Sequence, residues 1–136
     1  MTTIPDLSGV NAAVAKAIEE IQRIFQPSGW DVQPDGAGGA RIRFESVELP
    51  DTYQQSETWI GAHIPAQIPY ADVYPIFIRG DLIRRDGTAL TPPVTPNHSF
   101  MGVPAVQVSR RTNGVKDFGQ SAAMKLQKVI AWMHKS

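Results

Sequence analysis

The chain contains no cysteine in its 136 residues, so it has no disulfide bond and no thiolate metal ligand. It has no run of about eighteen apolar residues, which excludes a membrane-spanning segment of the usual helical kind. Thirteen basic residues balance thirteen acidic ones, so no overall field attracts nucleic acid or an anionic membrane. The N-terminus lacks a basic segment followed by an apolar one. We therefore expect no secretory signal and a cytoplasmic location.

Several catalytic signatures are also absent. The three histidines have neither HxH nor HExxH spacing, which argues against a zinc enzyme. No GxSxG sequence marks a hydrolase nucleophile. The glycines at 36, 38 and 39 are not followed by Lys-Ser or Lys-Thr, so they do not form a phosphate-binding loop. We expect this chain to need no metal and no cofactor.

Eleven prolines and eleven glycines predict many turns. The length predicts one domain over residues 1–136, large enough to bury a core. Two of the tryptophans, Trp59 and Trp132, are predicted to lie in that core.

Apolar spacing predicts two amphipathic helices. The first covers about residues 11–26, begins with Asn11 or Ser8 as a cap, and ends at Pro27. The second covers about residues 117–134, with Asp117 and Gln120 as a variant of the capping box. The apolar stripes of the two helices are Val14, Ile18, Ile21 and Phe25 in the first, and Ala122, Leu126, Val129 and Met133 in the second.

Between the helices, alternating apolar and polar residues predict strands at 30–33, 40–49 and 58–64, with others at 76–84 and 106–108. The alternation slips near residues 45–47, which indicates a bulge or a strand end. Residues 88–104 hold four prolines and little periodicity, so we expect a long irregular loop of the kind that often carries function. The chain is therefore predicted to be α+β, with an N-terminal helix, an antiparallel meander, a long loop and a C-terminal helix.

Three short motifs occur in order between residues 69 and 109. They are Tyr74-Pro75 before a strand, the triplet Pro96-Asn97-His98, and Gly102-Val103-Pro104-Ala105 before alternating valines. This order resembles the core of the ubiquitin-conjugating enzymes, and their bacterial relatives in particular. The resemblance implies that Tyr74 and Pro75 support an active-site loop, and that Ala105 stands where the family has its nucleophilic cysteine. The order within the triplet differs from the His-Pro-Asn of the family.

An enzyme of this family accepts the C-terminal carboxyl of a modifier as a thioester and passes it to an amine. The acceptor must be a nucleophile and later a leaving group, which requires a thiolate. An alanine methyl does neither, so the chain is inactive as written. By the same resemblance, Asn97 or His98 would stabilise the oxyanion or take a proton from the amine. The structural alternative for His98 is a residue that braces the loop.

The resemblance implies two partners, a ubiquitin-like modifier with an exposed C-terminal tail and its activating enzyme, which would consume the ATP. The exposed face of the first helix is a candidate interface for the activating enzyme, through Lys16, Glu20 and Arg23. Arg110 and Arg111 are candidates for contact with an acidic partner, or else a solvated pair.

Of two interpretations of Ala105, we adopt the first and keep the second as the alternative. In the first, a cysteine was replaced by alanine in the laboratory or in evolution, and Ala105→Cys restores thioester formation. In the second, the chain is a natural non-catalytic module that binds a ubiquitin-like modifier or its activating enzyme. The codon at this position in the native gene distinguishes an engineered replacement from a natural alanine.

Overall fold

The computed structural model describes residues 6–68, 73, 75–109 and 122–135. These residues form two helices and a six-stranded antiparallel sheet with the strand order β1-β2-β3-β4-β6-β5. The predicted α+β class is confirmed. The elements in chain order are α1 (Ala12–Phe25), β1 (Gly29–Pro34), β2 (Ala40–Glu48), β3 (Glu57–Ile64), β4 (Ile76–Arg79), β5 (Val94–Phe100), β6 (Val103–Val108) and α2 (Ala122–Lys135).

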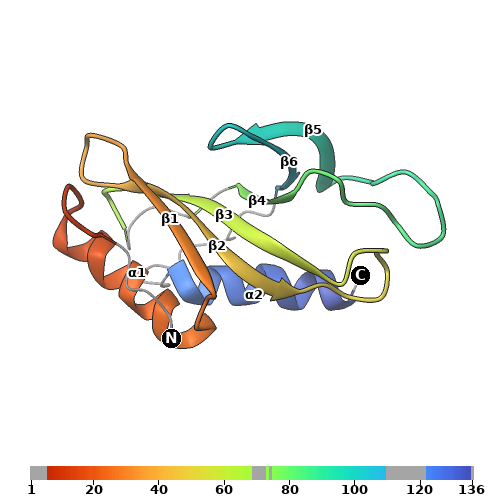
Figure 1. Cartoon of the computed structure of the whole chain (residues 1–136), viewed down its shortest axis with the longest axis horizontal. Helices are drawn as coiled ribbons and strands as arrows, with labels where there is room; N and C mark the ends of the chain where they lie inside the picture. Colours follow the sequence, from red (N-terminus) through yellow and green to blue (C-terminus); the bar gives the residue numbers. More distant parts are fainter. Residues whose placement is uncertain (1–5, 69–72, 74, 110–121, 136) are drawn as a thin grey trace.

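The two helices lie together on one side of the sheet, and the β5–β6 hairpin curls over on the opposite side (Figure 1). The main core fills the space between the helices and the sheet. It is built from the predicted stripes of both helices and from every second residue of the central strands, such as Ile42, Ile60, Ile78 and Val106. The other residues of these strands face away from the helices, on a surface that we call the outer face.

Asn11 fixes the start of α1. Its side-chain oxygen accepts a hydrogen bond of 2.8 Å from the backbone N–H of Val14, as an N-cap does, and its side-chain amide donates to the carbonyl of Ala66 at 2.9 Å. Its backbone N–H also donates to the carbonyl of Gly38 at 2.8 Å. One residue thus ties the helix to the β1–β2 turn and to the end of β3.

The predicted bulge in β2 is confirmed. The register between β2 and β3 shifts between Phe44 and Val47, so that Val47 pairs with Thr58 and Glu48 pairs with Glu57. The predicted strand over 76–84 is shorter, because β4 ends at Arg79. The predicted helix over 117–134 begins within the described residues at Ala122, and its predicted cap lies outside them.

The prediction of an irregular loop over residues 88–104 is wrong for the second half of this range, which forms β5 and the start of β6. A register shift between Thr95 and His98 takes up Pro96 and Asn97, and Asn97 has a left-handed backbone with φ of 69°. Proline is tolerated in this strand because β5 is at the edge of the sheet. Together the proline and the bulge hide the two-residue period of the strand.

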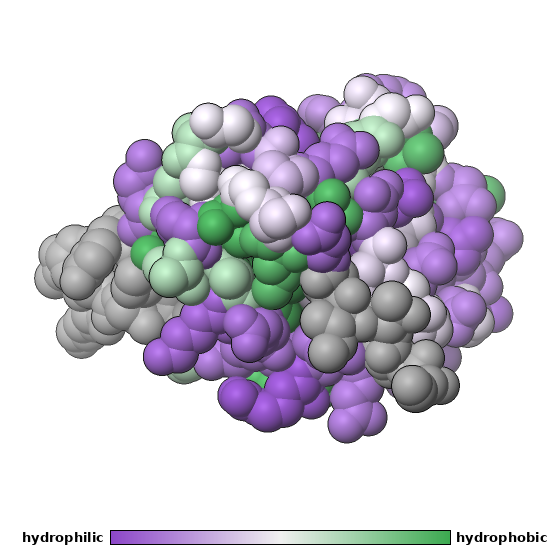
Figure 2. All heavy atoms as spheres, turned by 60° about the vertical axis from the view of Figure 1, so that its left-hand side comes forward, coloured by the Kyte–Doolittle hydropathy of each residue, from purple (hydrophilic) through white to green (hydrophobic). Residues whose placement is uncertain are grey.

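The surface around the start of α1 and the β1–β2 turn is mostly hydrophilic, with a limited hydrophobic area at its centre (Figure 2). Neither helix within the described residues is long and apolar enough to cross a membrane.

Asp35 holds the β1–β2 turn against β3. One carboxylate oxygen accepts hydrogen bonds from the backbone N–H groups of Ala37 and Gly39, at 2.7 and 3.1 Å, and the other lies 2.7 Å from Nε2 of His63. The hydrogen bond to His63, followed by the one to Ala37, lowers the pKa of Asp35 below its ordinary value of 3.8. Because the folded-state pKa is lowered, the ionised carboxylate stabilises the fold fully above the ordinary value of 3.8, and this stabilisation is lost as the pH falls from there through the lowered pKa.

We therefore expect the free energy of unfolding of Asp35→Asn to decrease less at acidic pH than that of the parent protein. The asparagine keeps an acceptor for the two N–H groups but has no carboxylate to protonate. Urea unfolding between about pH 6 and about pH 3 should show a smaller loss of stability in the variant than in the parent protein. Parallel profiles of the two proteins would contradict the role given to Asp35.

Candidate functional site

Ala105, the position that the resemblance gives to the nucleophile, lies within β6. Its direct cross-strand partners are Arg79 on β4 and His98 on β5. Its chain neighbour Val106 belongs to the main core, so Ala105 points to the outer face. The residue is nevertheless only 1% exposed. A nucleophile at this position would be part of a paired strand rather than of an open loop.

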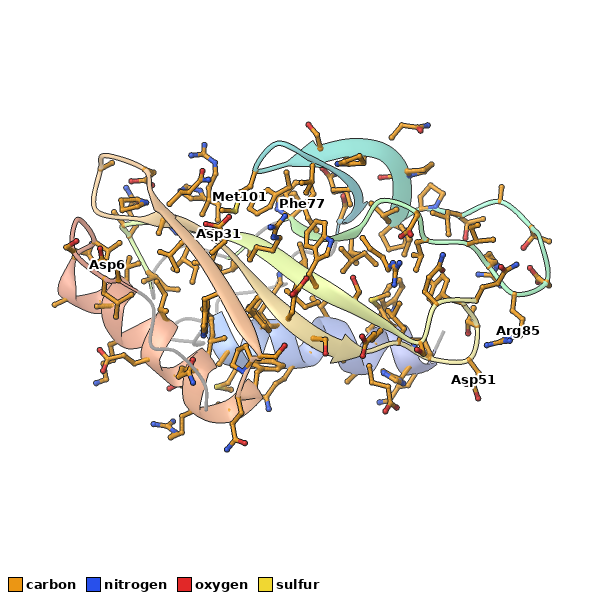
Figure 3. All side chains as sticks on the ribbon, in the orientation of Figure 1. Asp6, Asp31, Asp51, Phe77, Arg85 and Met101 are labelled. Carbon is orange, nitrogen blue, oxygen red and sulfur yellow. The ribbon has the colours of Figure 1, made fainter. Side chains whose placement is uncertain are left out.

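The β5–β6 hairpin folds onto the outer face and covers this region. The Phe100 ring stacks on the Phe77 ring with centroids 4.7 Å apart and an interplanar angle of 18°. A side chain at Gly61 would come within 2.7 Å of the Phe100 ring, so the ring lies directly against the backbone of β3. Phe77 and Met101, a residue of the hairpin turn, lie on the side of the sheet away from the helices (Figure 3).

His98 is brought next to Ala105 by the β5–β6 pairing. Directly opposed residues of an antiparallel pair stand on the same face, with Cβ atoms about 5 Å apart. The His98 Nε2 atom lies 3.0 Å from the Thr95 hydroxyl, and the ring is partly buried. Asn97 is exposed, in the bulge one residue earlier. The structure therefore brings together two of the predicted site residues, Ala105 and His98, with Asn97 beside them.

Arg79, on the other side of Ala105, is held by its neighbours. Its Nε and Nη2 donate to the two carboxylate oxygens of Asp81 at 2.5 and 2.8 Å, and its Nη1 donates to the carbonyl of Glu57 at 2.9 Å. These charge-assisted bonds lower the pKa of Asp81 and raise the pKa of Arg79, because they favour both ionised forms. The positive charge of this cross-strand neighbour of Ala105 is therefore paired.

A cleft of about 500 Å³ opens on the outer face beside this pair. Pro104 lines the cleft, but Ala105, the next residue, does not. Trp59 also lines it, and the guanidinium carbon of Arg43 lies 5.6 Å from the centre of the Trp59 ring, in a cation–π contact. Trp59 is thus a half-exposed residue of the outer face, which corrects the prediction that places it in the core.

The remaining predicted residues are not at this place. Lys16 and Arg23 are exposed on α1, in the layer on the other side of the sheet, and Glu20 lies 3.9 Å from Arg23 in an ion pair. Pro75 immediately precedes β4 and is partly buried. The predictions for Tyr74, Arg110 and Arg111 fall outside the described residues.

Sequence reasoning missed Arg79, Asp81 and Trp59. The position of Trp59 could have been predicted from the alternation in β3. Ile60, Ala62 and Ile64 define the core face of this strand, and Trp59 falls on the opposite face. The Arg79–Asp81 pair spans a glycine and depends on the end of β4. It becomes visible only when the strand boundary is known.

No protein-family model, no curated protein and no solved structure matches the chain.

Proposed function

We propose that the chain is a non-catalytic binding module laid out like a ubiquitin-conjugating enzyme, which holds a ubiquitin-like modifier or its activating enzyme. The observation that carries this proposal is the burial of Ala105, which is 1% exposed and paired on both sides within the sheet. A modifier tail cannot reach a nucleophile at this position without opening the β5–β6 hairpin. Of the two interpretations of Ala105, this burial favours a natural module over a disarmed enzyme.

The proposed partners dock on two different layers of the molecule. The exposed residues Lys16 and Arg23, with Glu20 beside them, offer α1 as the surface for an activating enzyme, by analogy with the conjugating enzymes. The modifier would contact the outer face. The proposal places the module in the cytoplasm, without a bound cofactor, and leaves ATP to the activating enzyme.

A second candidate function is a carrier of the modifier whose cysteine has been replaced by Ala105. The observation in its favour is the position of His98 and Arg79, which flank Ala105 in the sheet. A histidine and a guanidinium beside a cysteine favour its thiolate form. Against it, Asp81 and the carbonyl of Glu57 take up the donors of Arg79.

The reactivity of a thiol at position 105 separates the two functions. We expect the Ala105→Cys protein to react with the aromatic disulfide DTNB at least about 100-fold more slowly than a Ser99→Cys control, because buried thiols are inert. Ser99 lies on the same hairpin but is exposed, so the control tests the effect of burial within one hairpin. The release of thionitrobenzoate gives both rates directly.

A small thioester tests the acyl-transfer step without an activating enzyme. The mercaptoethanesulfonate thioester of a short glycine peptide is incubated with Ala105→Cys. If the introduced cysteine were a carrier, its thiolate would attack the carbonyl carbon, form a new C–S bond and release mercaptoethanesulfonate. Mass spectrometry would then find the acylated protein, and His98→Ala would slow its formation. Fast labelling by DTNB together with this adduct would refute the binding module and establish the carrier.

A further inference from the structure

A second cleft, of about 420 Å³, adjoins the first at one end of the sheet. The two clefts share Ser46 and Glu57 as lining residues, so together they form one groove, which we call the acidic groove. The second cleft is lined by the end of β2, by the loop that follows it up to the start of β3, and by Arg85. Asp51 and Arg85 mark this end of the molecule (Figure 3), and Arg85 Nε donates to the carbonyl of Asp51 at 2.9 Å.

Two carboxylates lie side by side in the acidic groove. Glu48 on β2 and Glu57 on β3 are direct cross-strand partners after the bulge, and both are exposed. Like charges directly opposite each other destabilise an antiparallel pair. Neither carboxylate, nor that of Glu45 or Asp51 in the same groove, forms an ion pair within the described part of the chain. A cation placed between Glu48 and Glu57 would turn this repulsion into attraction.

The groove has only two cations of its own among the described residues, and both are occupied. Arg79 is bound to Asp81 and to the carbonyl of Glu57, as described above. Arg85 donates through Nη2 to the carbonyl of Tyr53 at 3.1 Å, in addition to its bond with Asp51. Arg79 also interacts electrostatically with the carboxylate of Glu57. Five carboxylates nevertheless line the two clefts against these two arginines, so the groove carries a net negative charge.

Tyr53 provides an independent sign that a ligand belongs in the groove. The residue is only 4% exposed and lines the second cleft, yet its phenol oxygen has no hydrogen-bond partner in the described structure. The described residues contain no fully enclosed side-chain oxygen or nitrogen without a partner, so the small exposed part of Tyr53 includes this hydroxyl. A buried tyrosine usually satisfies its hydroxyl. The hydroxyl of Tyr53 is thus a polar group without a partner among the described residues, in a residue that lines the cleft.

We infer that the acidic groove binds the lysine or arginine side chains of an extended segment of a protein partner. The charged head of one such side chain would lie between Glu48 and Glu57 and donate to the hydroxyl of Tyr53. Its aliphatic stem would lie along Leu49 and Pro50, which line the same cleft and are buried. The first cleft continues the path of the segment past Glu45 and the ring of Trp59, which attracts cations through its face. The inference does not depend on the chemistry of position 105.

The probes are three acetylated peptide amides, of alternating lysine and glycine, arginine and glycine, and glutamate and glycine. Titration of the ¹⁵N-labelled protein at low salt should show binding of the two basic peptides, with shifts at the amides of Glu48 and Glu57 and at the Trp59 indole. The glutamate peptide should not bind. Comparing the affinities of the two basic peptides shows whether the groove prefers an ammonium or a guanidinium group. A tenfold rise in salt concentration should weaken the binding of both peptides.

Substitutions in the groove identify the residues that bind. Glu57→Gln should lower the affinity for the preferred basic peptide about fivefold. Tyr53→Phe, which keeps the packing of the ring, should lower it about threefold. Glu19→Gln is the matched control, because it removes the same charge from an exposed position on α1. Glu57→Gln should also leave the stability of the free protein unchanged or raised, because it removes the repulsion with Glu48. This result excludes unfolding as the reason for weaker binding.

Three results would overturn the inference. An equal loss of affinity in Glu19→Gln and Glu57→Gln would show that only the overall charge matters. Shifts that map away from the groove would locate the peptide elsewhere. Calcium ions that reproduce the same shifts and displace the peptide would make the groove an ion site. Failure of peptide binding leaves the DTNB test of Ala105→Cys unaffected, so the two proposals fail separately.

Discussion

Replacing Ile18 by alanine is expected to lower the free energy of unfolding by about 3–4 kcal/mol, which is a large part of the stability of a domain of this size. Ile18 is completely buried in the apolar stripe of α1, which packs on the sheet together with Val14 and Ile21. The loss combines the transfer of the deleted atoms to water with the cavity that they leave. Urea unfolding should show a lower midpoint with an unchanged slope.

Ile24→Ala is the matched control, because it makes the same change in the same helix. Ile24 is 40% exposed, so its truncation should cost less than about 1 kcal/mol, and the higher helix propensity of alanine offsets part of that cost. A similar loss in the two variants would mean that α1 is not packed on the sheet through the face that contains Ile18.

The elements with strong local signals could be predicted from the sequence. The first helix has an apolar stripe with a 3.6-residue period, two candidate caps at Ser8 and Asn11, and a proline after its end. The structure confirms the stripe and the end of the helix, and it selects Asn11 as the cap. The bulge in β2 was visible because the alternation of apolar residues changes phase there. These signals depend only on neighbours in the chain, so no tertiary information was needed to find them.

The β5 strand could not be predicted in the same way. Pro96 and the left-handed Asn97 break its alternation, and what holds the strand is its pairing with β6. That pairing depends on the two-residue turn at Met101 and Gly102, both of which have positive φ values, as a tight hairpin requires. Gly102 indicated a turn in the sequence, but nothing in the sequence indicated that Met101 would adopt a positive φ.

The sequence indicated which residues belong to the candidate site but not how they are arranged in space. The motifs brought Ala105 and His98 into one hypothesis, and the register makes them direct neighbours. The burial of Ala105 depends on how the hairpin folds over Phe77, which no local pattern encodes. The pair of Glu48 and Glu57 likewise follows from the shift in register at the bulge. Residues nine apart in the sequence do not otherwise indicate that their charges meet.

The second large effect is expected from Gly80→Ala, which should cost about 2–3 kcal/mol of stability. A side chain at Gly80 would come within 2.6 Å of the backbone carbonyl carbon of Pro104 and within 2.8 Å of the backbone nitrogen of Ala105. These are atoms of a paired strand, so β4 and β6 must separate to make room. The close approach of the two backbones therefore requires glycine at this position.

Gly29→Ala is the control for Gly80→Ala. A side chain at Gly29 would meet only a carboxylate oxygen of Glu45, at 3.8 Å, so this variant should unfold at nearly the same urea concentration as the parent. Separation of β4 from β6 should also expose position 105. In the Ala105→Cys background, Gly80→Ala should therefore speed the reaction with DTNB, whereas Gly29→Ala should not. Unchanged stability and unchanged thiol reactivity in Gly80→Ala would contradict the close contact between Gly80 and β6, and with it the buried setting of Ala105 that favours a binding module over a carrier.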